Sequence, residues 1–484
     1  MDADTVLRIK PALTEYLHEF DGCFARSQTR GHFATYVGGQ LSDLARKSVE
    51  PIADAAGVPP RTLQEFLGLS LWDELQMREL LQQRVAGCQP HPHSVGIIDE
   101  TSVVKKGKKT ACVQRQYCGA VGKTENCVVS VHLGYATPEF HTLLDGELFL
   151  PEETWADMER RQEAGIPDHV TYRAKWEIAL AQYRRAVGNG LRFGWLTFDE
   201  LYGRNKVFLR ELDGLGQDFV AEVPVDFHVW TTLPEILHRE HARDRCGRPR
   251  TYPRLKAKHN PMVSVQDVAR YSPKMRAEPW VTYQVKEGSK GPMVWDVRHM
   301  FVYLQDERGL PTRPYHLLVA RSVTDPDTVK YFISNAPEST PVQTLLLVAF
   351  SRWRIERMFE DSKMELGLDH FEVRNYGSIT RHLILSCVSH LFLAEFHQVE
   401  RGKKTGADHQ PTGDGNGATG TALGSRWPMF AEAREESRCA IADNTRAKRS
   451  CQEEPPQGNN TETTHAGSLS EKRQKVSVAE NLAL

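Results

Sequence analysis

Three carboxylates are placed where they could share a metal ion. Asp99 ends the apolar run VGII, Asp199 ends the apolar run FGWLTF, and Glu356 lies within the stretch SRWRIERMFEDSK. A buried strand that ends in an acid places that acid at the edge of the sheet, where it faces a crevice. Carboxylates that converge on one point cannot all stay ionised without a counter-charge, which hard divalent cations such as Mg²⁺ or Mn²⁺ supply. We therefore predict that Asp99, Asp199 and Glu356 form a metal site.

The residues beside Glu356 indicate what this site would act on. At helical spacing, Arg352, Glu356 and Lys363 lie on one side of a helix. Two metal ions about 3.5–4 Å apart activate a nucleophile and stabilise the leaving oxygen of a phosphodiester. Arg352 and Lys363 would then hold phosphates of a nucleic acid.

Each of these residues also has an ordinary structural interpretation. A stripe of alternating charge is usually a solvated helix face with weak pairs four residues apart. A strand-end Asp is usually a helix cap or turn residue. Two such Asp residues, each followed by Glu, favour the catalytic interpretation. Glu360 and Asp361 are alternative ligands on the same helix, and Glu356 is preferred because of its spacing from Arg352.

The elements that must position these acids follow from hydrophobic periodicity. Residues 1 to about 90 have the period of consecutive helices, and from about residue 95 the period becomes that of strands. CVQRQYCGA and ENCVVSVHLGYA predict a hairpin or a meander, followed by a helix, a strand and a helix. Strands broken by basic loops come next, and one long helix from about 339 to 366 carries Glu356. This order predicts an α/β protein.

Composition excludes several classes of protein. The chain has 484 residues, a formal net charge of −2 and 40% hydrophobic residues, as in a soluble globular protein of two or three domains. No apolar run approaches the roughly 18 residues of a membrane span, and the acidic N-terminus is not a signal peptide. Nine scattered cysteines indicate reduced thiols. We expect a cytoplasmic protein without a membrane partner, associated with the nucleoid when it binds DNA.

Two dense basic stretches interrupt this balanced charge. One follows Asp99 and contains Lys105, Lys106 and Lys108; the other, HARDRCGRPRTYPRLKAKH, contains Arg248 and Arg250. Basic runs are usually solvated loops, but their positions beside a catalytic strand and inside an inserted segment favour phosphate contacts. We therefore expect double-stranded DNA to be the partner.

Three segments resemble the acid-bearing blocks of bacterial insertion-sequence transposases of the DDE superfamily. They are VGIIDETSVVKKGKK, WLTFDELYGRN and SRWRIERMFEDSK, and the acids are 100 (199 − 99) and 157 (356 − 199) residues apart. In one branch of the superfamily the last block reads Tyr-x-x-Arg-x-x-x-Glu-x6-Lys. Arg352, Glu356 and Lys363 match it, and Ala349 stands at the tyrosine position.

The resemblance implies an RNase H-like catalytic domain with a mixed five-stranded sheet flanked by helices. The expected division is a helical N-terminal domain that binds DNA (1–90), a catalytic domain in two parts (91–220 and 336–400), a strand-rich insertion (221–335) and a disordered polar tail (401–484). The implied activity is cutting of phosphodiesters at element ends and joining of the 3′-hydroxyl to target DNA by two Mg²⁺ or Mn²⁺ ions. A homodimer on paired ends is also implied.

Two other functions are compatible with the sequence. The chain could be a decayed or repurposed copy that binds DNA without catalysis, a hypothesis that Ala349 and the unusual tail keep open. It could also be a host nuclease of the same fold, which would only hydrolyse DNA. Metal-dependent cleavage of a labelled duplex separates the first alternative from the others, and strand joining separates a transposase from a nuclease.

Overall fold

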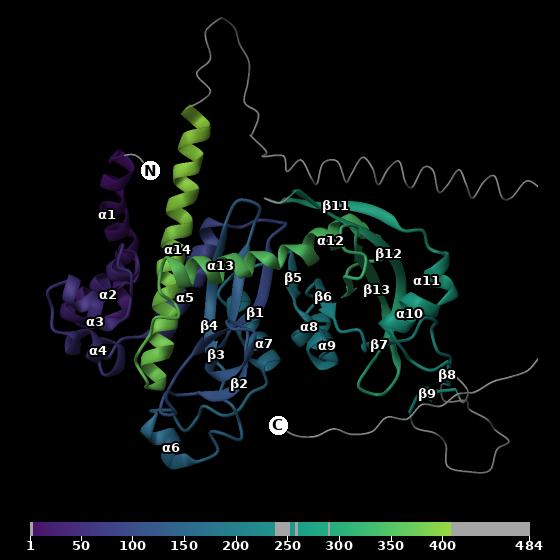
Figure 1. The fold of residues 1–484 in the computed structure, drawn as a ribbon, viewed down its shortest axis with the longest axis horizontal. Helices are drawn as coiled ribbons and strands as arrows, with labels where there is room; N and C mark the ends of the chain where they lie inside the picture. Colours follow the sequence, from purple (N-terminus) through teal and green to yellow (C-terminus); the bar gives the residue numbers. More distant parts are fainter. Residues whose placement is uncertain (1–2, 238–251, 257–259, 289–290, 408–484) are drawn as a thin grey trace, which may run out of the picture. The chain divides into compact units, whose positions relative to one another are not determined.

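A computed structural model describes residues 3–237, 252–256, 260–288 and 291–407 (Figure 1). Arg248 and Arg250 lie outside the described residues, and so does the expected tail from residue 408 onward. All described elements belong to one compact unit. The domain boundaries expected within this unit stay a prediction.

A mixed sheet carries the first two acids. Its central strands follow the order β4–β3–β1–β5–β6, with β1 antiparallel to β3, β3 antiparallel to β4, and β5 parallel to both β1 and β6. This arrangement confirms the predicted five-stranded mixed sheet. The strands are β1 (Val95–Val104), β3 (Lys123–Ala136), β4 (His141–Leu148), β5 (Trp195–Phe198) and β6 (Phe219–Val223).

The expected hairpin is formed by β2 (Gln114–Cys118) and the first part of β3. Gly122 closes it at a φ of +66°, a conformation that glycine adopts without steric cost. The second part of β3 pairs with β4, so both β2 and β4 lie along the edge of β3 that is opposite to β1.

The strands of the insertion continue the same sheet. β14 (Val329–Ser334) pairs antiparallel with β6, and β13, β12 and β11 follow in turn, which makes ten strands in the sheet. The insertion is therefore joined to the catalytic strands by backbone hydrogen bonds. Its described elements are β7 (His228–Val229), β8 (Ile236–Leu237), β9 (Arg254–Leu255), β10 (Val263–Ser264), α10 (Val265–Tyr271), α11 (Pro273–Ala277), β11 (Val281–Gly288), β12 (Gly291–Gln305) and β13 (Pro311–Ser322).

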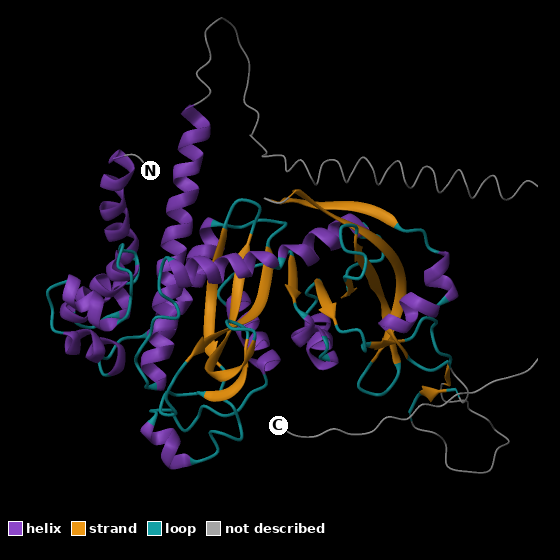
Figure 2. Cartoon of the chain, in the orientation of Figure 1, coloured by secondary structure: helices purple, strands orange, loops and turns teal. Residues whose placement is uncertain are grey.

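Helices cover the central strands (Figure 2). α7 packs on β3 and β4, α12 lies against β5 and β6, and α13 lies against β1, β3 and β4. The predicted single helix over 339–366 is two helices that meet at Arg352, whose N–H bonds to the carbonyl of Ala349, three residues back. Such a bond marks a tightened turn. The helices are α6 (Met158–Glu163), α7 (Lys175–Gly188), α8 (Glu200–Gly203), α9 (Lys206–Gly214), α12 (Val342–Ser351) and α13 (Trp353–Met364).

The N-terminal helices pack against one long C-terminal helix, α14 (Tyr376–Ala407). α14 continues past residue 401, where the polar tail was expected to begin. Its contacts include buried hydrogen bonds from Tyr36 to His382 and from Gln40 to Ser386. The N-terminal elements are α1 (Ala3–His18), the 3-10 helix Asp21–Cys23, α2 (Ser27–Gln40), α3 (Val49–Ala55), α4 (Pro60–Gly68) and α5 (Glu74–Cys88).

The segment Tyr376–Glu400 of α14 is long and apolar enough to cross a membrane, by length and composition alone. However, 67% of its most apolar window is buried inside the protein. Its polar side chains also have partners in the N-terminal helices: Arg381 pairs with Glu74, and Glu395 pairs with Arg84. These features are typical of the core helix of a globular protein.

A buried ion-pair network ties α5 and α7 to β4. The Asp145 side chain is fully buried and pairs with Arg78 Nε at 3.1 Å and Arg185 Nη2 at 2.8 Å. Burial alone would raise the pKa of Asp145, but the attraction of Arg78 and Arg185 lowers it below its ordinary value. Because the folded-state pKa is the lower one, this stabilisation is present above the unfolded pKa of about 3.9 and is lost as pH falls through the folded pKa.

We predict that Arg78→Met lowers the free energy of unfolding by about 3 kcal/mol, because it leaves a buried carboxylate short of a partner. The matched control is Arg61→Met, which removes an arginine whose side chain is 84% exposed and paired with Glu65. The control should cost less than about 1 kcal/mol. Urea unfolding at neutral pH measures both, and equal losses would contradict the structural role of the network.

Candidate active site

The pairing of β1 with β5 brings the two aspartates to one place. In this parallel pair Ile98 lies opposite Phe198, so Asp99 and Asp199 come next on their chains at the same level of the sheet. Asp99 continues β1, whereas Asp199 ends its strand and caps α8 by accepting a hydrogen bond from the N–H of Leu201 at 3.0 Å. The ordinary interpretation of Asp199 as a cap is therefore also correct, and it fixes the orientation of the carboxylate.

α13 brings Glu356 towards these aspartates. The helix approaches the sheet closely at Gly134 on β3, where a Cβ would lie 2.7 Å from Sδ of Met358. One turn before Glu356, the side chain of Arg352 joins two of the acids. Its Nη1 donates to Asp99 Oδ2 at 2.9 Å, and its Nη2 donates to Glu356 Oε1 at 3.0 Å.

The electrostatics of the site show an excess of negative charge. Burial raises the pKa of Asp99 to about 7, with a further contribution from the negative charge of Asp199, while Arg352 opposes the rise. Burial also raises the pKa of Asp199 above its ordinary value, again against Arg352. The Asp99 side chain is only 14% exposed, whereas that of Glu356 is 62% exposed. One guanidinium therefore faces three carboxylates, two of them shielded from water.

This donor set fits a hard divalent cation, because carboxylate oxygens are its preferred ligands and the two partly buried aspartates lack sufficient counter-charge. Arg352 supplies part of that charge here. In the described part of the chain, no three His, Cys, Asp or Glu side chains are gathered closely enough to form a ready-made metal cluster. A cation shared by all three acids therefore requires Arg352 and Glu356 to reorient.

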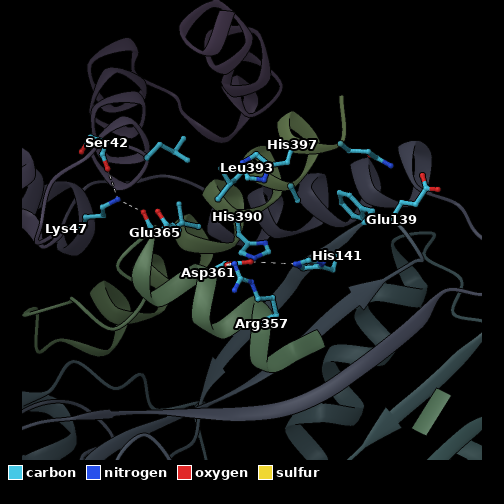
Figure 3. A pocket seen from close by; sticks show the side chains of 15 residues that line it. Ser42, Lys47, Glu139, His141, Arg357, Asp361, Glu365, His390, Leu393 and His397 are labelled. Atoms are coloured by element: carbon cyan, nitrogen blue, oxygen red, sulfur yellow. Dashed lines mark hydrogen bonds and ion pairs between the residues drawn. The ribbon is translucent and has the colours of Figure 1, made fainter. Parts of the chain in front are cut away.

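The alternative acids on α13 have other partners. Glu360 pairs with Arg357 at 3.0 Å, and both side chains are half exposed. Asp361 pairs with Arg357 at 2.8 Å and faces His141 at 3.7 Å (Figure 3). These two partners of Asp361 line a separate cavity of about 420 Å³ between α13, α14 and the start of β4, and Glu356 does not line it.

The predicted phosphate-binding residues differ in their contacts and in their exposure to solvent. Arg352 is engaged by carboxylates, so a phosphate contact would require it to exchange partners. Burial lowers the pKa of Lys363, which is half-buried. Lys105 donates to the carbonyl of Phe371 at 2.5 Å, lies 3.6 Å from the centre of its ring, and has a pKa lowered by burial to about 8. Lys106 and Lys108 are exposed.

Glu100 makes contacts beside Asp99 that were not predicted from the sequence. It accepts from Nζ of Lys175 at 2.5 Å and from the hydroxyl of Tyr202 at 3.5 Å. Lys175 begins α7 and Tyr202 lies in α8, so these bonds tie both helices to β1 beside Asp99. The only sign in the sequence that Glu100 could matter was its position next to Asp99, and that position does not identify Lys175 and Tyr202 as its partners.

The chain matches known proteins over most of its length. A family model described as DDE superfamily endonuclease matches residues 19–292, a range that contains Asp99 and Asp199 and ends before Glu356. The chain is also 26% identical, over 368 residues, to the probable transposase for insertion sequence element IS701 of Microchaete diplosiphon, which covers 75% of this chain and 82% of the relative. Because the family match spans more than half of the 484 residues, this chain belongs to the DDE superfamily of endonucleases.

Proposed function

We propose that this protein is an insertion-sequence transposase that cuts phosphodiester bonds at the ends of its element and joins the freed 3′-hydroxyl to target DNA. The observation that carries this proposal is the pair of partly buried aspartates at one level of β1 and β5, with Arg352 linking Asp99 to the glutamate of α13. The similarity to the IS701 transposase supports transposition over simple hydrolysis.

In this proposal Asp99, Asp199 and Glu356 hold two Mg²⁺ or Mn²⁺ ions. When bound, such ions activate the attacking oxygen and stabilise the leaving oxygen of an in-line displacement. Asp199 is held in place by its bond to the α8 backbone, and Asp99 by acceptance from the N–H of Glu100 at 2.8 Å. Arg352 and Lys363 would bind the phosphates that flank the cut.

The acid positions argue for an active protein over a decayed copy. Loss of selection would remove the charge at one or more positions without affecting the fold, yet all three acids are present, and the partial burial of Asp99 and Asp199 raises the pKa of both. Since an element has two ends, we further propose that a homodimer acts on paired ends.

We predict that Glu356→Gln abolishes Mg²⁺-dependent cleavage of a labelled duplex while leaving DNA binding equal or stronger. The substitution removes one metal ligand and one negative charge that repels phosphate. Loss of several kcal/mol of transition-state stabilisation corresponds to a rate lower by about a thousandfold.

Glu360→Gln is the matched control, because it makes the same change on the same helix at an acid that pairs only with Arg357 among the described residues. It should cleave at the wild-type rate. Wild-type cleavage by Glu356→Gln would remove this acid from the site.

A second prediction concerns pH and metal. Without metal, folded Asp99 has a pKa of about 7, above the unfolded value of about 3.9. The contribution of Asp99 to the free energy of unfolding therefore becomes less favourable as pH rises from about 3.9 to about 7. Asp99→Asn should therefore stabilise the metal-free protein by about 1 kcal/mol or more at pH 8 and by much less at pH 5.

Thermal unfolding measures the stability of Asp99→Asn relative to the wild type. Without metal the variant should be the more stable protein at pH 8, and with added Mn²⁺ the wild type should be. Mn²⁺ should raise the unfolding temperature of the wild type and of Glu360→Gln, but not that of Asp99→Asn. An equal Mn²⁺ effect on all three proteins would place the metal elsewhere.

A further inference from the structure

A basic pocket lies beyond the carboxyl end of β1, and the proposed catalytic chemistry does not use it. It has a volume of about 520 Å³ and is lined by Lys108, Lys109, Trp155, Arg160, Glu163, Ala164 and Arg374. Four of these residues are cationic and one is acidic. The two lysines belong to the basic run that was expected to contact phosphate, whereas Arg160, Arg374 and the site that they share with the lysines are new.

The cations of this pocket are not used in ion pairs. Among the residues that the structure describes, no carboxylate lies within 4.0 Å of Lys108, Lys109, Arg160 or Arg374. The chain elsewhere pairs many of its surface cations, including Arg184 with Glu211 and Arg357 with Glu360. Like charges gathered without a compensating carboxylate repel one another, which is an arrangement suited to binding an anion.

Three segments far apart in the sequence build the pocket and hold it together. The N–H of Ala111 donates to the carbonyl of Arg374 at 2.8 Å, and the indole N–H of Trp155 donates to the carbonyl of Val113 at 3.1 Å. The guanidinium of Arg160 donates to the carbonyls of Thr154 and Lys108 at 2.7 and 3.1 Å. The cations are therefore presented by a fixed frame.

The loop after β1 also contains the one positive φ of a non-glycine residue in the described part of the chain. Cys112 is fully buried and has a φ of +63°. A non-glycine residue keeps this conformation only where the surrounding structure requires it. The loop that carries Lys108 and Lys109 thus has a defined path.

The pocket offers charge but no aromatic surface. Trp155 is 1% exposed, and Arg160 lies over its ring at 4.1 Å from the centroid. Proteins that bind single strands stack unpaired bases on accessible aromatic rings, whereas contacts with duplex DNA outside the grooves are made to phosphates by Arg and Lys. This lining therefore suits the backbone of a duplex.

We propose that this pocket binds phosphates of duplex DNA that flank the cut, at a distance from the acids set by β1. Val104 follows Asp99 by five positions, which corresponds to about 17 Å at the rise of a strand. The pocket lies beyond Val104, and duplex DNA rises about 3.4 Å per base pair, so the contacts fall about five or more base pairs from the scissile phosphate. The position of these contacts relative to the scissile phosphate rests on the proposed function, whereas the affinity of the pocket for duplex DNA does not.

The first test is the salt dependence of duplex binding by the full chain carrying Lys108→Ala/Lys109→Ala. Each lost phosphate contact lowers the slope of log affinity against log salt by about 0.9, so two should lower it by about 1.8. Between about 50 and 200 mM salt the variant should then lose about tenfold less affinity than the wild type. Both lysines are exposed, so the variant should fold normally.

Arg184→Ala/Arg192→Ala is the control, because it removes the same charge at two exposed positions on and after α7. Its slope should stay within about 0.3 of the wild type, since it removes no phosphate contact. An equal loss in both double variants would reduce the effect to net charge and overturn the proposal. An unchanged slope in the Lys108/Lys109 variant, with calorimetric binding of inorganic phosphate by the wild type, would assign the pocket to a small anion and overturn it too.

The second test locates the contact with phosphate-ethylation interference on a duplex of the DNA that flanks the gene, using Glu356→Gln to prevent cleavage. Interference about five or more base pairs from the mapped cut should vanish when Lys108→Ala/Lys109→Ala is added. Interference that persists there would overturn the proposal. If no cleavage exists, the proposed function fails, while the salt slopes still report on the pocket.

Discussion

Two partly buried carboxylates lie at one level of β1 and β5, and the cost of holding two negative charges there is the constraint on which the site depends. The register of this parallel pair fixes them at one level of the sheet, and burial raises the pKa of both. Arg352 partly compensates the charge, because its guanidinium reaches Asp99 from the junction between α12 and α13. The residue at which the predicted helix breaks is thus also the residue that partly compensates the charge of the site.

The same sheet links the site to the insertion. β6 pairs with β5 on one side and with β14 on the other, and Glu222 of β6 pairs with Lys330 of β14 at 2.5 Å. Backbone ladders are stiff in comparison with a flexible linker. DNA contacts made by the described strands of the insertion would therefore be held at a fixed distance from the aspartates. An insertion attached by loops alone would not hold its DNA contacts at a fixed distance from the aspartates.

The sequence predicted the elements better than their contacts. The apolar runs before Asp99 and Asp199, and the change of period near residue 95, were enough to predict an α/β protein, and the mixed five-stranded sheet was implied by the resemblance to DDE transposases. The spacing of Arg352 and Glu356 predicted a pair on one helix face, which the structure contains. The bond from Arg352 to Asp99 joins residues 253 positions apart, and no local pattern contains that information. The continuation of the sheet into β14 and the assembly of the basic pocket were missed for the same reason.

Charge also determines how DNA can enter the site. Three carboxylates and Arg352 sum to a formal charge of −2, or −1 when Asp99 is protonated, and either value repels a phosphate. The cations of the pocket beyond β1, which form no ion pair with a described carboxylate, would have the opposite effect at the proposed distance of about half a helical turn of duplex. If the pocket binds the flank as proposed, a duplex would be held there while its scissile phosphate is still repelled. Metal ions bound by the three acids would supply positive charge in place of Arg352, whose guanidinium could then bind a phosphate. Under the proposed function, binding of the flank would therefore be independent of metal, and entry of the scissile bond would depend on it.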